Sequence, residues 1–129
     1  MRVFKTKDFA RFARKAKITD DALCEAIARA GRGLVDADLG GGLIKQRVAR
    51  DGRGRSGGFR TIIAVRLHDR AVFLYGFAKS DKDNISADDL SELKREATVL
   101  LGLSRRALAD AVDNKEFQEV FCDAQEISE

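Results

Sequence analysis

The sequence contains no proline, one histidine and two cysteines among its 129 residues. Without proline, a proline-rich linker is excluded and compact secondary structure is favoured. No apolar run approaches the roughly 20 residues that a membrane-spanning helix needs. Cations interrupt Met1–Lys17 every few residues, so we expect no secretory signal in that segment. We therefore expect one soluble domain over residues 1–129, large enough to bury a modest core.

The scarcity of histidine and the absence of familiar motifs argue against the common enzyme classes. His68 lies in a predicted turn, where we expect it to be solvated, and no acid pair accompanies it to form a metal site. No serine or cysteine stands in a recognisable nucleophile motif, and no GxxxxGK[ST] sequence indicates a phosphate-loop NTPase. Helix-turn-helix, zinc and RNA-recognition patterns are also missing. We expect neither a metal nor another cofactor.

The two cysteines, Cys24 and Cys122, are far apart in the sequence and lack metal-like spacing. Unpaired cysteine is among the residues most often buried. We therefore predict two reduced, partly buried thiols and a cytoplasmic location.

Charge is abundant and is sorted along the chain, although the net charge is only +3. Residues 1–39 carry +3, residues 40–82 carry ten Lys or Arg against three Asp or Glu, and residues 83–129 carry −7. A basic middle indicates contact with phosphate, whereas the acidic end reads as a solvated helix face or as a cover for the basic surface.

Hydrophobic periodicity predicts the order of helices and strands. Each expected helix begins at a Ser or Thr whose side chain can cap it, namely Thr6, Thr19, Ser86 and Ser104. Strands are expected at 1–4, 43–49, 59–67 and 71–77, the last three as an antiparallel meander, while Glu116–Phe121 fits either a helical turn or an edge strand. The predicted fold is α+β, with two N-terminal helices and a C-terminal helix packed on a twisted antiparallel sheet.

The basic ribbon, residues 40–60, holds six Lys or Arg and one Asp. Alternation places Lys45 and Arg47 on one strand face and Arg60 on the neighbouring strand, so that their cations can converge. We expect Arg60 to be exposed beside a well-packed strand. Guanidinium forks bind phosphate in a bidentate manner, which indicates a polyanionic partner. The alternative is a solvated hairpin kept basic for solubility or edge protection.

Two loops flank these strands. Asp51–Gly58 is expected to be a mobile loop whose glycines let the backbone approach a ligand closely. Phe77–Lys82 follows the last strand, and Lys79 and Lys82 can add to one cationic concavity; the alternative is a charged loop before a helix.

An enzyme equipped with these residues needs a substrate that supplies its own nucleophile. RNA does so, because its 2′-hydroxyl can attack the adjacent phosphate. Fixed cations then stabilise the negative charge that gathers on the phosphorus.

The chain resembles the RelE/HigB-type toxins of bacterial toxin–antitoxin systems. The resemblance rests on the order of elements, on GGL-x-K-x-R at residues 41–47, on SGG-[FY]-R at residues 56–60 and on FLYGFAKSDKDNIS at residues 73–86. It is closest to the HigB-like branch, which has a long Gly- and cation-rich hairpin loop. It covers about residues 1–102 of a single RelE-like toxin domain and leaves residues 103–129 as a C-terminal extension.

The resemblance implies a RelE-like fold and a ribosome-dependent endoribonuclease that cuts mRNA in the decoding site without a metal. It also implies a cognate antitoxin, often a helix-turn-helix protein that represses the operon, so that DNA would be contacted only through the antitoxin. No membrane is implied.

The family pattern assigns roles to individual residues. Lys45 and Arg47 match paired basic residues that contribute base and phosphate-stabilising roles, Arg60 matches a phosphate-binding arginine, and Lys79 matches a basic residue at the end of the last strand. Contacts with RNA and the ribosome are then expected from Arg50, Arg53, Arg55, Arg66 and Lys82.

Two positions depart from the family pattern. Ser80 stands where the best-known members have an arginine that acts as an acid, and Ser86 stands where they have a stacking tyrosine. Lys79, Lys82 or Arg66 can substitute, and Tyr75 offers a phenol although its strand position favours core packing. The general acid therefore stays open.

Two other functions fit the same features. A ParE-like protein would share the fold and inhibit DNA gyrase by binding it, and a plain nucleic-acid-binding module would use the basic ribbon as a phosphate clamp. Lys45, Arg47 and Arg60, which lie in segments of the nuclease pattern, favour the endoribonuclease.

Overall fold

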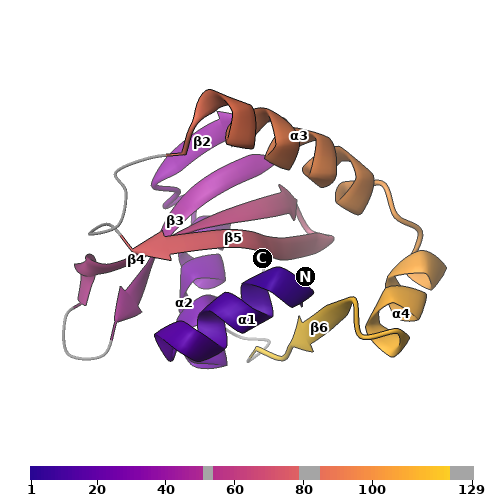
Figure 1. The fold of residues 1–129 in the computed structure, drawn as a ribbon, viewed down its shortest axis with the longest axis horizontal. Helices are drawn as coiled ribbons and strands as arrows, with labels where there is room; N and C mark the ends of the chain where they lie inside the picture. The colour runs from indigo at the N-terminus through magenta and orange to yellow at the C-terminus, as the bar shows by residue number, and fades with distance from the viewer. Residues whose placement is uncertain (51–53, 79–84, 123–129) are drawn as a thin grey trace.

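The computed structural model describes residues 1–50, 54–78 and 85–122, without the side chains of residue 50 and residues 54–57. The predicted α+β class is confirmed (Figure 1). In chain order the elements are β1 (Arg2–Thr6), α1 (Lys7–Ala16), α2 (Asp20–Gly31), β2 (Ala37–Gly40), β3 (Leu43–Arg50), β4 (Gly54–Arg66), β5 (Arg70–Ala78), α3 (Ala87–Leu101), α4 (Arg105–Asp113) and β6 (Phe117–Val120).

The described strands form one sheet in the order β2-β3-β4-β5-β1-β6. The predicted antiparallel meander is present as β3, β4 and β5. The pair between β1 and β5 is parallel, whereas β6 runs antiparallel to β1. The segment 116–121, for which helix and strand were both open, therefore contains an edge strand.

Helices cover both faces of the sheet, with α1 and α2 on one side and α3 on the other (Figure 1). Period-two alternation sends Val48, Ile63 and Phe73 into the core with α1 and α2. The intervening positions Leu43 and Ile62 join a second core with α3 and α4. The two cores therefore lie on opposite faces of the sheet.

All four predicted helix starts are confirmed. The side chains of Thr6, Thr19, Ser86 and Ser104 each accept a hydrogen bond from the backbone N–H three residues on, at 3.0–3.1 Å. Such N-caps contribute about 1 kcal/mol each by satisfying a donor that the helix cannot pair. None of the helices described is long and apolar enough to cross a membrane.

The predicted loop at Asp51–Gly58 is wrong in its second half, because Gly54–Gly58 belong to β4. Pairing continues from Val48–Phe59 to Arg50–Gly54 with one shift of register. Hydrogen bonds from β3 thus override the weak strand preference of a glycine-rich segment. The remaining part of that prediction, residues 51–53, lies outside the described residues.

The prediction of reduced thiols is also wrong, because Cys24 and Cys122 form a disulfide. Their Cα atoms are 5.6 Å apart although 98 residues separate them. The bond follows from β6, which returns beside β1 and brings the next residues against α2, a pairing that sequence spacing cannot show.

Candidate functional site

Two rows of side chains cross β3, β4 and β5 on the face that α3 covers. The strand register aligns Arg47 with Arg60 and Phe77, and it aligns Lys45 with Ile62 and Tyr75. Directly opposed residues of antiparallel strands share one face with Cβ atoms about 5 Å apart. The structure therefore brings together Lys45, Arg47 and Arg60, as the alternation predicted.

The three cations differ in exposure. Arg47 is exposed, Lys45 is half-buried, and Arg60 is only 8% exposed, so the expectation that Arg60 is exposed is wrong. The cause is its central place in the sheet, with Arg47 on one side and the buried ring of Phe77 on the other. In the described part of the chain, the buried Nη1 of Arg60 has no hydrogen-bond partner.

A buried, unpaired guanidinium nitrogen is costly and usually has a reason. Leaving a buried donor unsatisfied costs about 1–3 kcal/mol, and more for a charged group. Like charges directly opposite on paired strands, as in Arg47 and Arg60, add a further penalty. An anionic oxygen would accept a hydrogen bond from the unpaired nitrogen and would offset the repulsion between the two guanidinium groups. The arrangement is therefore suited to a phosphate group.

A β-bulge in β5 completes this face. Ile62 pairs with Tyr75, but the next residue, Ile63, pairs with Phe73, which leaves Leu74 as the extra residue. Without the bulge, Phe73 and Tyr75 would point to the same side. With it, Phe73 enters the α1–α2 core, while half-buried Tyr75 packs against the α3 core beside the cations.

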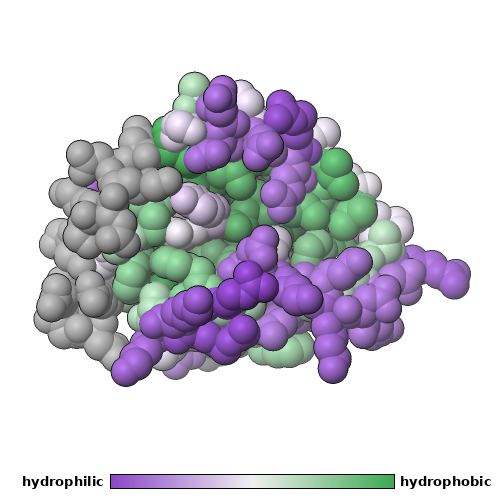
Figure 2. Space-filling view, viewed as in Figure 1, coloured by the Kyte–Doolittle hydropathy of each residue, from purple (hydrophilic) through white to green (hydrophobic). Residues whose placement is uncertain are grey.

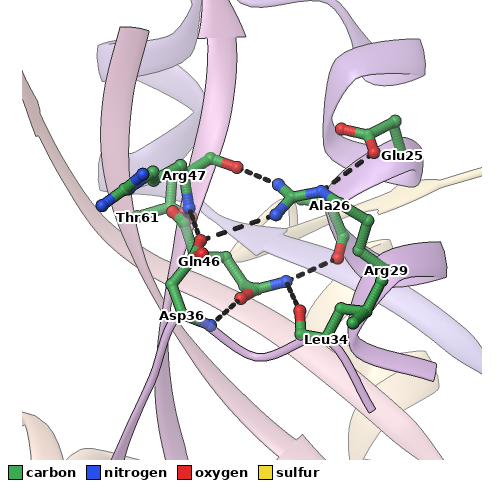
Figure 3. Close-up of polar contacts among 8 residues, drawn as sticks. All are labelled: Glu25, Ala26, Arg29, Leu34, Asp36, Gln46, Arg47 and Thr61. Carbon is green, nitrogen blue, oxygen red and sulfur yellow. Dashed lines mark hydrogen bonds and ion pairs between the residues drawn. The ribbon is translucent and has the colours of Figure 1, made fainter. Parts of the chain in front are cut away.

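A polar network lies behind β3, on the side of α2 (Figure 3). Buried Gln46 donates from Nε2 to the carbonyl oxygens of Ala26 and Leu34 at 2.9 and 3.3 Å, and its Oε1 accepts from Asp36 N at 2.7 Å. The Thr61 hydroxyl donates to the Gln46 carbonyl at 2.9 Å. The network ties β3 to α2 and β4.

The backbone of Arg47 contacts the polar network, whereas its side chain points elsewhere. Its backbone N–H donates to Asp36 Oδ2 at 2.6 Å, and its carbonyl accepts from Arg29 Nη2. Its guanidinium points away from this network (Figure 3). The backbone of a predicted site residue is therefore held by two buried or half-buried charged side chains.

Sequence reasoning missed the network residues Arg29, Asp36 and Gln46. One signal was available: Gln46 alternates with the apolar residues Ile44 and Val48 on one strand face. An amide at a core position implies buried partners, because unpaired polar groups are costly there.

Arg66 lies away from the site. It is six residues from Arg60 along β4, which corresponds to about 20 Å. Its Nη1 donates to the Leu101 carbonyl at 2.9 Å, and its Nε lies 3.6 Å from Asp69. Arg70 similarly donates to the carbonyls of Leu100 and Leu103. Both arginines therefore hydrogen-bond to backbone carbonyls at the C-terminal end of α3.

Other predicted site residues lie outside the described residues, namely Arg53, Lys79 and Lys82, as does Ser80. The side chains of Arg50 and Arg55 are also not described, although their backbones lie in β3 and β4. Ser86 is the N-cap of α3, as predicted, and not a surface for stacking a base. His68 is exposed in its predicted turn, with a positive φ of 64°.

A hollow of about 680 Å³ separates α1 from α3 and reaches Tyr75. Figure 2 shows it as an apolar surface between two hydrophilic helices. Its rim is acidic, and burial, followed by the charges of Asp8 and Glu92, raises the pKa of Glu96. Among the described residues no group of three or more His, Cys, Asp or Glu is placed to hold a metal ion.

Comparison with known proteins agrees with the earlier resemblance. No curated protein matches the chain. A protein-family model, described as the RelE toxin of the RelE/RelB toxin–antitoxin system, matches residues 1–120. The match includes α4 and β6, which lie beyond the part covered by the sequence motifs. Since it spans nearly the whole chain, this protein belongs to the RelE toxin family, whose members act with a cognate antitoxin.

Proposed function

We propose that this toxin is a ribosome-dependent endoribonuclease of the HigB-like branch that cuts mRNA without a metal. The single observation that carries the proposal is the buried Nη1 of Arg60, which has no hydrogen-bond partner among the described residues. It lies beside Arg47, on the strand face shared with Lys45. A phosphate group of RNA is the ligand that this arrangement suits best.

The proposed reaction is an attack of a ribose 2′-hydroxyl on the adjacent phosphorus. The O–P bond forms as the bond to the 5′-oxygen of the next nucleotide breaks, which leaves a 2′,3′-cyclic phosphate and a 5′-hydroxyl. Lys45, as the neutral amine, takes the 2′-hydroxyl proton, and the leaving 5′-oxygen takes a proton from a general acid or from water. Arg47 and Arg60 bind the phosphate oxygens where negative charge grows. We assign the general acid to no single residue. Lys79, which matches a basic residue of the family pattern, is a further candidate for the catalytic site.

In our proposal the basic residues around Lys45, Arg47 and Arg60 face the ribosome. Arg50, Arg53, Arg55 and Lys82 contact ribosomal RNA through salt-sensitive phosphate contacts. Arg66 was expected to share this role, but its place at the end of α3 gives it a structural task as well. We therefore expect Arg66 to contribute least of the five.

The partner in this proposal is a helix-turn-helix antitoxin that also binds operon DNA, and the location is the cytoplasm. The disulfide between Cys24 and Cys122 is unusual for that compartment, where thiols are kept reduced. The antitoxin neutralises the toxin by covering the surface of residues 40–82, or its size keeps the toxin from entering the ribosome. A complex that leaves this surface open, with no steric block to the ribosome, would contradict that account.

Expression in bacteria tests the activity. We expect growth arrest, loss of translation and mRNA cuts at defined codon positions, and we expect Arg60→Ala to abolish all three at equal protein level. Filamentation with DNA damage would instead indicate a gyrase inhibitor, and absence of toxicity would indicate a binding module. Growth arrest by the Arg60→Ala protein would refute the assignment of the site.

A further inference from the structure

The outer edge of β3 changes partner at the candidate site. Strand β2 pairs with β3 at Leu43, Ile44 and Lys45, and within the described residues that pairing goes no further. Beyond it, Arg47 would expose a backbone N–H and a backbone carbonyl at the sheet edge. Unpaired edges of this kind invite slippage and pairing with other chains.

Two side chains take the place of the missing strand. Asp36 Oδ2 accepts the Arg47 N–H at 2.6 Å, and Arg29 Nη2 donates to the Arg47 carbonyl. A neighbouring strand would offer the same two groups, one acceptor and one donor, to this residue. The pair thus closes the sheet edge at Arg47, whose guanidinium points away from these two side chains (Figure 3) and whose strand register places it opposite Arg60.

The two side chains are themselves fixed. Arg29 is 4% exposed, and its Nη1 lies 3.5 Å from Asp36 Oδ2 while its Nε donates to Glu25 Oε2 at 2.9 Å. The Asp36 backbone N–H donates to buried Gln46 at 2.7 Å. Removing a partner would leave the buried charge of Arg29 uncompensated at a high cost, so these contacts favour one arrangement of its side chain.

We propose that Arg29 and Asp36 are positioning residues that hold the Arg47 backbone, and with it the Arg47 guanidinium, against the substrate phosphate. This inference rests on the proposed nuclease function. Neither side chain touches RNA. They act through Arg47, since a displacement of about 1 Å at a reacting group costs on the order of 100-fold in rate.

The test compares Asp36→Ala with Asp38→Ala. Asp38 is a matched control because its carboxylate also accepts a backbone N–H, from Gly40 at 2.9 Å, two residues farther along the same segment. In cleavage of mRNA on purified ribosomes, Asp36→Ala should slow the cut about 10- to 100-fold at saturation and change the ribosome Kd less than twofold. Asp38→Ala should change neither.

Amide hydrogen exchange measures positioning without reference to cleavage. The Arg47 amide should exchange at least tenfold faster in Asp36→Ala, while amides in the centre of β4 keep their protection. An unchanged Arg47 amide, or an equal loss of cleavage in Asp38→Ala, would overturn the proposal. If the unaltered toxin cuts no mRNA, the proposed function fails, and the exchange experiment still decides whether Asp36 holds Arg47.

Discussion

Arg60→Met is the most informative single substitution, because the site and the fold make opposite demands on this residue. The Arg60 side chain is 8% exposed and its Nη1 lacks a partner among the described residues. Methionine is nearly as long, is apolar and adapts its shape to the space available. The variant removes an unsatisfied buried donor and a like-charge contact across the strands while it keeps most of the packing.

The expected gain in stability follows from these two terms. An unsatisfied buried donor costs about 1–3 kcal/mol, and a like-charge cross-strand pair costs up to about 1 kcal/mol. We therefore expect Arg60→Met to raise the free energy of unfolding by roughly 1–3 kcal/mol, after allowance for some overlap of the two terms. For a chain of this length the melting temperature should rise by about 3–10 °C. Cleavage of mRNA should be abolished.

Thermal and denaturant unfolding, measured together with mRNA cleavage, test whether Arg60→Met raises stability and abolishes activity. Arg47→Met is the control: Arg47 is exposed, so its substitution should change stability by less than about 1 kcal/mol while also reducing cleavage. A less stable Arg60→Met protein would show that the guanidinium has native partners that hold the fold together. A stable protein that still cuts mRNA would show that Arg60 is not part of the site.

Three further predictions concern the scaffold. Gly76→Ala should lower the free energy of unfolding, measured by urea titration, by about 1–3 kcal/mol, because the new Cβ would lie 2.3 Å from Phe12 Cε2. Unchanged stability would show that α1 can move away from β5. The folded state raises the pKa of Glu96, so this carboxyl destabilises the fold once it is ionised. Glu96→Gln should therefore raise the melting temperature at pH 7. This gain should vanish as the pH falls below about 4, because the carboxyl is then protonated in both the folded and the unfolded state. An equal gain at both pH values would contradict this cause. Cys122→Ser should lower stability by about 2–4 kcal/mol in oxidised protein, and titration of two free thiols in untreated protein would contradict the Cys24 pairing.

The elements of the fold could be predicted because their signals are local. A capping side chain such as Ser86 acts on an N–H three residues away, and alternation along one strand fixes which side chains share a face. The convergence of Lys45, Arg47 and Arg60 followed from that alternation alone, once the two strands were taken as neighbours.

The missed features all depend on distant parts of the chain. The bulge at Leu74 turns Tyr75 toward the cations, but a run of aromatic residues looks the same with or without an extra residue. The burial of Arg60 depends on its two strand neighbours, and the support of Arg47 by Arg29 joins a helix to a strand 18 residues later. Such contacts need the assembled sheet and cannot be derived from periodicity.

The chemical step offers the most direct test of the nuclease proposal. We would place a single 2′-deoxynucleotide on the 5′ side of the mapped cut in an otherwise unaltered mRNA and incubate it with purified ribosomes and toxin. The proposed mechanism predicts that this message stays intact at that position, while the all-ribose message yields a 2′,3′-cyclic phosphate and a 5′-hydroxyl. Cleavage of the deoxy-substituted message at the same position and rate would contradict attack by the 2′-hydroxyl and, with it, the role given to Lys45, Arg47 and Arg60.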